Sequence, residues 1–571
     1  MKKKWMARLL AAVMVAGVLS GCGGGNNETA SSVEVEKDGG NISLWESGET
    51  AQEEELEGEA CPSETFDEAM CDMSPSVMAA GAYSEACESE AYEEYVPYEE
   101  FNTEEYSTVE ENPFMSVSMS PYSTFSADVD TASYANLRRM IREGYGPEEI
   151  PSGAVRTEEM LNYFSYDYDG PKGNEPFGVT AVISNCPWNE EAKLLVLGLQ
   201  TEEIDFSEAA DSNIVFLIDV SGSMYDDNKL PLLKQAFGML VENLGEKDRV
   251  SIVTYASSND VILEGVPGSE QDRIMGALEA LEAGGSTNGG DGIITAYELA
   301  EKYFIRGGNN RVIIATDGDL NVGITSESEL HDLIEEERES GVYLSVLGFG
   351  MGNYSDTNME TLADYGNGNY AYIDSLTEAR KVLVEELGAT MVTVAKDVKL
   401  QIEFNPAFVS EYRLIGYENR TMAAEDFEDD TKDAGEIGAG HSVTVVYEMI
   451  PCDNAEASED NLRYQDTSLT DLALNSNEWL TLSVRYKEPE GDTSKLLEYP
   501  IGADHYTENP SEDFLFAAAV AEFSMLLRDS DYVGEGSYEQ VLELLDDIEP
   551  GDEYKEEFYD LVDMTRIQAG W

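Results

Sequence analysis

Apolar and polar positions follow two different periods along the chain, and the change of period separates its regions. Between residues 210 and 396, short apolar segments alternate with helical ones. The predicted strands are 214–218, 250–255, 261–263, 312–316, 342–347 and 370–373. The predicted helices are 229–244, 271–281, 292–304, 329–340, 358–365 and 376–394. Strands such as 312–316 are apolar on both faces, which predicts a doubly wound α/β domain with helices covering both sides of a parallel sheet.

After Lys396 the period changes to two, as expected for strands with one buried face. Apolar residues alternate with polar ones in 398–404 and again in 480–486. Residues 511–569 return to a helical pattern, and residues 121–205 contain a predicted helix, 132–144, and two predicted strands. We expect the strands of 177–200 and 398–487 to build one β-sandwich, with the α/β domain inserted between them.

These patterns divide the chain into six parts. They are a signal peptide (1–21), an acidic stalk (22–120), an N-terminal α+β module (121–205), the α/β domain (206–396), a β-rich, sandwich-like module (397–508) and a C-terminal helical segment (509–571). Residues 23–112 hold 26 acidic residues and one basic residue, Lys37. Like charges repel and apolar area is scarce, so we expect an extended, flexible spacer in which tyrosines such as Tyr106 are scattered.

The N-terminus has the features of an export signal. Positions 2–8 carry four basic residues, 9–19 is an apolar run too short to cross a bilayer, and Leu19-Ser20-Gly21-Cys22 follows. This order resembles the bacterial lipobox, which implies lipidation of Cys22. The expected location is the bacterial cell envelope, with the protein anchored to a membrane outside the cytoplasm. The alternative is an ordinary signal peptide with an incidental cysteine.

The charge of the chain excludes one class of partner. Its 571 residues include 34 basic and 116 acidic ones, a net charge of −82, and this field repels nucleic acid. Cysteine usage is less decisive. With Cys22 lipidated, five cysteines remain, and they cannot all pair with one another. Cys186 and Cys452 either pair across domains or stay free thiols.

The strongest chemical signal stands at the end of the first strand of the α/β domain. Asp219, Ser221 and Ser223 form an Asp-x-Ser-x-Ser turn after that strand. Thr287 lies in a Gly-rich loop, and Asp317 ends the strand 312–316. In a doubly wound sheet, strand carboxyl ends near the reversal of strand order collect ligands, so these side chains can meet on one rim. Their oxygens suit a hard divalent cation.

These residues resemble the metal-ion-dependent adhesion site (MIDAS) of the von Willebrand factor type A (VWA) family, at all five of its positions. The resemblance covers about 205–396 and implies a Rossmann-like VWA fold. The phrases at 123–130 and 412–417 further resemble a bacterial lipoprotein subgroup, so the likeness runs from about 121 to 569. It implies a divalent cation, Mg²⁺ foremost and otherwise Mn²⁺ or Ca²⁺. Two carboxylates and three hydroxyls leave the shell of such an ion open, so the expected partner is a protein that supplies an Asp or Glu.

Enzyme signatures are missing from the sequence. His331, His441 and His505 show no zinc-ligand spacing, and neither a Gly-x-Ser-x-Gly elbow nor a phosphate-binding loop occurs. We therefore expect a binding protein for adhesion or envelope protein assembly and not an enzyme. The alternatives are a structural or chaperone-like protein with a stabilising metal and a metal-dependent hydrolase.

Overall fold

The computed structural model describes residues 104–571 apart from 205–209, 286–291, 319–326, 353, 387–390, 453–468, 490, 550 and 571. The predicted signal peptide, Cys22 and most of the predicted stalk lie outside these residues. In the part of the chain that is described, no helix combines the length and the apolar character needed to cross a membrane.

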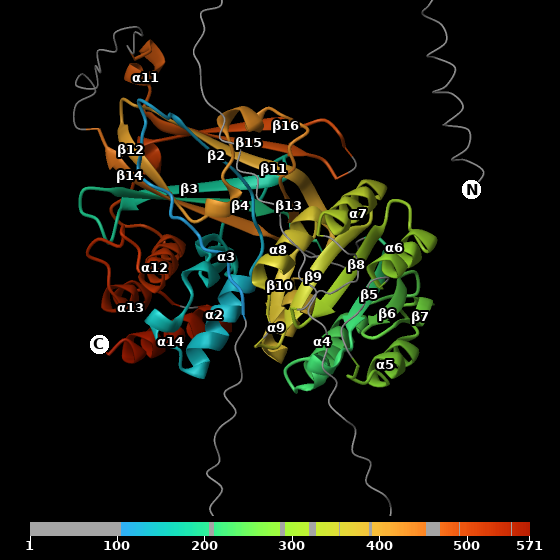
Figure 1. Cartoon of the computed structure of the whole chain (residues 1–571). Coiled ribbons are helices and arrows are strands. Elements are labelled where there is room, and N and C mark those ends of the chain that lie inside the picture. The colour runs from blue at the N-terminus through green and yellow to red at the C-terminus, as the bar shows by residue number, and fades with distance from the viewer. Residues whose placement is uncertain are drawn as a thin grey trace, which may run out of the picture. The chain divides into compact units, whose positions relative to one another are not determined.

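A six-stranded sheet forms the centre of the α/β domain (Figure 1). Its order is β10-β9-β8-β5-β6-β7, and all neighbours are parallel except β6 and β7. The strands are β5 (Ser212–Asp219), β6 (Arg249–Tyr255), β7 (Asn259–Pro267), β8 (Asn309–Thr316), β9 (Tyr343–Phe349) and β10 (Tyr370–Ile373). The predicted doubly wound fold is confirmed.

Helices cover both faces of this sheet because alternate residues of its strands are apolar on either side. Phe216 of β5 packs in a core with α4 (Leu230–Val241), α5 (Gln271–Glu279) and α9 (Leu376–Arg380). Val215 and Leu217 pack on the opposite face. That face holds α6 (Gly292–Lys302), α7 (Glu327–Ser340) and α8 (Asp356–Tyr365).

The order of the strands fixes the place where a ligand can bind. From β5 the chain moves to β6 on one side, and it later returns to β8 on the other side of β5. The carboxyl ends of β5 and β8 therefore flank the point where strand order reverses. Crevices for ligands open at this point in doubly wound sheets.

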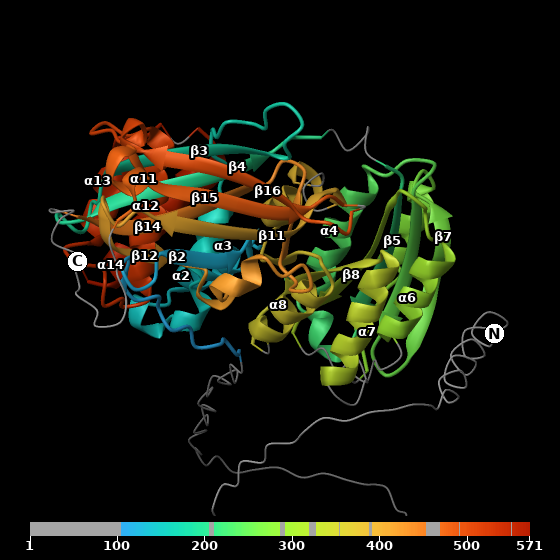
Figure 2. The same cartoon turned by 90° about the horizontal axis from the view of Figure 1, so that it is seen from above.

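Two antiparallel sheets share a second core, and Figures 1 and 2 show them stacked beside the α/β domain. One has the order β1-β12-β14-β4-β3, and the other has β13-β11-β15-β16 with β2 paired to β11. The strands are β1 (Met115–Ser116), β2 (Tyr122–Ser126), β3 (Phe177–Asn185), β4 (Lys193–Thr201), β11 (Thr393–Phe404), β12 (Val409–Ile415), β13 (Gly435–Gly438), β14 (Ser442–Pro451), β15 (Glu478–Lys487) and β16 (Lys495–Gly502). The α/β domain is inserted between β4 and β11, so the segments 121–205 and 397–508 share sheets instead of forming separate ones.

A helical layer covers the outer face of β4 and β14. Its helices are α2 (Ala132–Glu143), α3 (Thr157–Asn162), α12 (Glu512–Leu527), α13 (Tyr538–Asp546) and α14 (Glu553–Gln568). Leu194, Val196 and Val446 of the sheet join the aromatic core of this layer. The first and the last parts of the folded chain are thereby joined in one core.

Residues 104–120, which the sequence assigned to the stalk, contact the rest of the fold. Glu104 forms an ion pair with Arg139, 3.0 Å from carboxylate oxygen to guanidinium nitrogen, and β1 pairs with β12. The hydroxyl of Tyr106 accepts a hydrogen bond from Asn136 at 2.7 Å. Burial and the nearby Glu104 carboxylate raise the pKa of Tyr106. The acidic composition of this segment concealed its aromatic contacts, so the stalk assignment is wrong for residues 104–120.

The helix predicted for 376–394 does not run as one regular helix to its predicted end. α9 ends at Arg380, a π-helical turn spans Lys381–Glu385, and β11 begins at Thr393. The β-branched residues Val392, Thr393 and Val394 favour a strand over the helix predicted for 376–394. β11 therefore crosses the predicted boundary at residue 396.

The two described cysteines are free. Cys186 is buried in the core of the helical layer, and Cys452 is partly exposed. Of the two alternatives drawn from the sequence, the structure has the free thiols. Burial raises the pKa of the Cys186 thiol, so it stays protonated and behaves as an apolar core residue.

Glu522 carries a carboxyl group into the helical core. Its side chain is fully buried, Oε1 accepts a hydrogen bond from the Ser537 amide at 3.0 Å, and Oε2 has no hydrogen-bond partner among the described residues. Burial raises the pKa of Glu522 to about 7. Because this folded-state pKa exceeds the unfolded one, the carboxyl group costs stability as the pH rises from about 4.5 to about 7.

Glu522→Gln is therefore expected to stabilise the protein at pH 8 by up to about 3 kcal/mol and to change little at pH 5. Glutamine is neutral at both pH values, and its amide oxygen can keep the bond from Ser537. Urea unfolding at the two pH values measures the difference. A gain of equal size at pH 5 would contradict this account.

Candidate metal site

The first part of the site is the turn that follows β5. Asp219 is the last residue of this strand and is fully buried. Its Oδ1 accepts a hydrogen bond from the Ser221 amide at 2.7 Å, which fixes the carboxylate at the start of the turn. The hydroxyls of Ser221 and Ser223 lie 2.9 Å apart. Ser221 is buried and Ser223 is exposed, so the oxygens of the turn extend from the interior to the surface.

The second part comes from the end of β8. The hydroxyl of Thr316 donates to Oδ2 of Asp219 at 3.4 Å, so the ends of β5 and β8 meet. Asp317 follows Thr316 and is fully buried. Its Oδ2 accepts a bond from the ammonium of Lys229 at 3.0 Å, and its Oδ1 has no hydrogen-bond partner among the described residues. A buried carboxylate oxygen without a donor is costly unless a cation approaches it.

The Gly-rich loop reaches the same turn. The amide of Gly284 donates to the Val220 carbonyl at 2.8 Å, and the amide of Gly222 donates to the Gly285 carbonyl at 3.1 Å. Thr287, two residues farther on, lies outside the described residues. The structure therefore brings Asp219, Ser221, Ser223 and Asp317 to one end of the sheet and holds the chain that leads to Thr287 against the turn.

The surroundings of Asp219 disfavour its charged form. Burial, with a smaller contribution from the charge of Asp317, raises the pKa of Asp219 to about 6, while the bonds from Ser221 and Thr316 oppose the shift. Negative charge is thus concentrated in a place with little solvent. A positive ion placed here gains electrostatic energy that an exposed acidic patch does not provide.

The donor set suits a hard divalent ion. It offers carboxylate and hydroxyl oxygens and no sulfur or imidazole, the combination expected for Mg²⁺, Mn²⁺ or Ca²⁺. Among the described residues, no group of three or more His, Cys, Asp or Glu side chains is arranged to hold a metal. A metal bound here would therefore depend on serine and threonine hydroxyls as well as on the two aspartates.

Sequence reasoning missed Lys229. It stands just before α4, its side chain is 6% exposed, and its ammonium reaches Asp317. A Cβ at Gly350 would lie 2.3 Å from Cε of Lys229, so the glycine after β9 leaves the passage for this side chain. The lysine lies six residues after Ser223 in the sequence, but its contact with Asp317 depends on how β5 and β8 pair.

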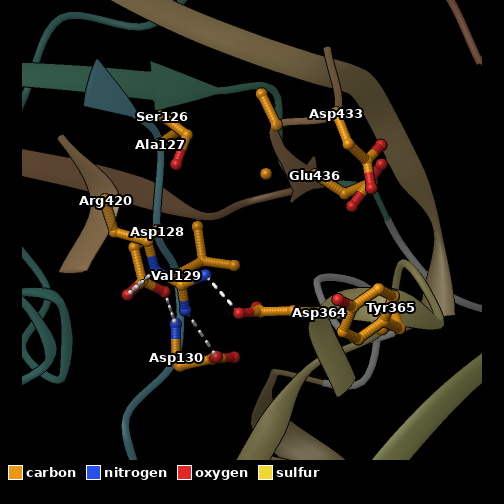
Figure 3. Close-up of a pocket in the computed structure, with 13 residues that line it drawn as sticks. Ser126, Ala127, Asp128, Val129, Asp130, Asp364, Tyr365, Arg420, Asp433 and Glu436 are labelled. Atoms are coloured by element: carbon orange, nitrogen blue, oxygen red, sulfur yellow. Dashed lines mark hydrogen bonds and ion pairs between the residues drawn. The ribbon is translucent and has the colours of Figure 1, made fainter. Parts of the chain in front are cut away.

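Apart from the candidate metal site, an acidic cavity lies between the α/β domain and the antiparallel sheets (Figure 3). It has a volume of about 360 Å³, and its acidic lining residues are Asp128, Asp130, Asp364, Asp433 and Glu436. Arg420 pairs with Asp128 at 3.1 Å, with Asp130 at 3.6 Å and with Asp364. These ion pairs connect α8 to the chain around β2. We assign this cavity to the interface between the α/β domain and the antiparallel sheets and not to the metal site.

Comparisons with known proteins now decide the family. Residues 213–386 match the von Willebrand factor type A domain, residues 389–567 match the family described as "Uncharacterized protein YfbK, C-terminal", and residues 100–196 match a family described as von Willebrand factor. The YfbK protein of Escherichia coli (strain K12) is 42% identical over 472 residues, which is 81% of each chain. The chain belongs to the YfbK family.

Other proteins share a shorter part of this YfbK family protein or have lower identity to it. Human inter-alpha-trypsin inhibitor heavy chain H3 is 26% identical over 172 residues, 28% of this chain and 19% of that one. A von Willebrand factor type A structure from Catenulispora acidiphila covers 71% of this chain and 91% of its own, with 14% identity and a TM-score of 0.39. Proximal thread matrix protein 1 of the mussel byssus, solved with zinc in its MIDAS motif, covers 31% and 45%, with 23% identity and a TM-score of 0.26.

Proposed function

We propose that this YfbK family protein is a lipid-anchored protein of the bacterial envelope that binds a protein partner through a divalent cation, Mg²⁺ foremost. The cation would be held by Asp219, Ser221, Ser223, Thr287 and Asp317. VWA domains generally mediate protein–protein binding, which supports the class of function. The observation that carries the proposal is Oδ1 of Asp317, a buried carboxylate oxygen without a hydrogen-bond partner among the described residues.

Each residue has a role that follows from its contacts. Asp219 accepts hydrogen bonds from the Ser221 amide and the Thr316 hydroxyl, so its carboxylate is held in place by the protein and not by solvent. Ser223 lies at the exposed edge of the turn, where a partner can reach it. The cation, when bound, supplies positive charge and an exchangeable coordination position to a carboxylate. No step of this function requires a nucleophile or a general base, so we propose a binding protein and not an enzyme.

The test is capture of envelope proteins with the full-length chain as bait, in Mg²⁺ or in chelator. A protein retained only in Mg²⁺ by the wild-type bait, and lost with Thr287→Ala, supports the proposal. Ser340→Ala is the matched control. Its hydroxyl donates to the Glu337 carbonyl at 2.6 Å at the end of α7, in a helix that runs away from the metal-binding rim.

The alternatives predict different results. If the metal only stabilises the fold, Asp317→Ala lowers the melting temperature and leaves partner capture intact. If the protein is a hydrolase, the purified wild-type protein shows hydrolytic activity even though no partner is captured. Capture of the same partner in chelator and in Mg²⁺ would contradict a metal-dependent binding site.

A further inference from the structure

The ammonium of Lys229 occupies a position that requires an explanation. It is a buried positive charge in the rim where the two site aspartates lie, and it reaches one of them at 3.0 Å. Burying an ammonium costs several kcal/mol unless a carboxylate pairs with it. Gly350, with φ at +74°, provides space for the lysine chain that a Cβ would remove. The backbone thus accommodates this particular contact.

Lys229 changes the net charge of the site. Asp219 and Asp317 contribute two negative charges and Lys229 contributes one positive charge, so without a metal the buried cluster has a net charge of −1 instead of −2. With a divalent cation the same cluster has a net charge of +1. A net positive site attracts one further carboxylate, whereas without the lysine the loaded site would already be neutral.

We propose that Lys229 is the internal counter-ion of the metal site, which keeps the VWA domain stable without metal and leaves the loaded site positively charged for a partner's carboxylate. This inference rests on the proposed function, because it concerns the same cation and the same ligand. It adds a positioning residue that is not one of the five predicted oxygen ligands. Lys229 acts through Asp317, whose carboxylate it holds by Oδ2, while Oδ1 has no hydrogen-bond partner in the part of the chain that is described.

The experiment is thermal unfolding of the full-length chain with chelator and with Mg²⁺, for wild type and Lys229→Met. Methionine keeps most of the side-chain volume and removes the charge. In chelator the variant is expected to melt about 5 °C or more below wild type, because two buried carboxylates lose their counter-ion. Mg²⁺ is expected to raise its melting temperature by more than it raises that of wild type. Calorimetric titration should show tighter Mg²⁺ binding by the variant.

Lys234→Met is the matched control, on the helix that Lys229 precedes. Its ammonium donates to the carbonyls of Glu279 and Leu281 and not to a site carboxylate. It should leave the Mg²⁺-induced rise unchanged. The double variant Lys229→Met, Asp317→Asn removes both members of the pair, and in chelator its loss should be smaller than the sum of the single losses.

The outcomes separate this inference from the proposed function. If wild type binds Mg²⁺ but Lys229→Met loses equal stability with and without it, Lys229 only fills space and the inference is wrong. Weaker Mg²⁺ binding by the variant also overturns it. If wild type does not bind Mg²⁺ at all, the metal site itself is wrong, and the inference falls with it.

Discussion

Asp219→Asn is expected to abolish Mg²⁺ binding without unfolding the protein. Residues that only orient metal ligands cost about 10–100-fold in affinity when removed, so loss of a carboxylate of the site itself should exceed about 100-fold. Asparagine retains the oxygen that accepts the bond from the Ser221 amide, so the turn should survive. Burial, with a smaller contribution from the charge of Asp317, raises the pKa of Asp219 to about 6, so removal of its charge also relieves a desolvation cost and a repulsion in chelator. Calorimetric titration with Mg²⁺ and thermal unfolding in chelator measure the two effects.

Asp226→Asn is the matched control for this prediction. Asp226 is an exposed acid seven residues farther along the chain, just after the turn that carries Ser221 and Ser223. Its neutralisation changes the surface charge by the same amount, so it should change the Mg²⁺ affinity by less than about threefold, as expected for a screened surface charge. Similar losses in both variants would mean that general acidity attracts the ion. A lower melting temperature of Asp219→Asn in chelator would contradict the proposed relief of charge.

The period of the sequence predicted the α/β domain well because its central strands, such as β5 and β8, are buried on both faces. Apolar runs such as the one in β8 can satisfy a sheet only when helices cover both sides. The antiparallel part was harder to divide from sequence. β2 pairs with β11, and β4 pairs with β14, across an insertion of nearly 200 residues. Period-two patterns reveal that a strand exists, but they do not identify its neighbour.

Two predicted segment boundaries show the same limit. Residues 104–120 have the acidic composition of a spacer, yet Glu104 is paired with Arg139 and Tyr106 is hydrogen-bonded to Asn136. Composition describes the average of a segment, whereas order here depends on a few contacts with a distant helix. Local pattern also misplaced the boundary after α9, because the predicted helix ran to residue 394 although β11 begins at Thr393.

For the candidate site, the sequence could place the predicted ligands Asp219 and Asp317 at one end of the sheet because both lie at strand ends. Asp219 ends β5, and Asp317 follows β8 at the reversal of strand order. The sequence could not reveal Lys229 as part of the site, since a lysine before an amphipathic helix is ordinary. Its role emerges only from the pairing of β5 with β8 and from the space above Gly350.

Arg138 holds the last helix of the VWA domain against the helical layer. From α2 its guanidinium donates to Asp374 at 2.9 and 2.5 Å, to Glu378 at 2.8 Å and to Glu557 of α14 at 2.9 Å. It also donates to the hydroxyl of Tyr163 at 3.0 Å. Its side chain is 1% exposed, so the attraction is barely screened by water. Burial raises the pKa of Glu378, and the positive charge of Arg138 opposes this rise.

Arg138→Met is accordingly expected to destabilise the protein by about 3–5 kcal/mol, because it leaves three carboxylates without their shared cation in a buried place. Arg142→Met is the matched control on the same helix. Arg142 pairs with Glu557 at 2.6 Å, but its side chain is 49% exposed, so its loss should cost at most about 1 kcal/mol. Urea unfolding at pH 7.5 measures both. Equal losses of stability in the two variants would mean that the burial of Arg138 adds nothing. Hydrogen exchange gives the location: if the protection of α9 falls only in Arg138→Met, the effect lies at the end of the VWA domain.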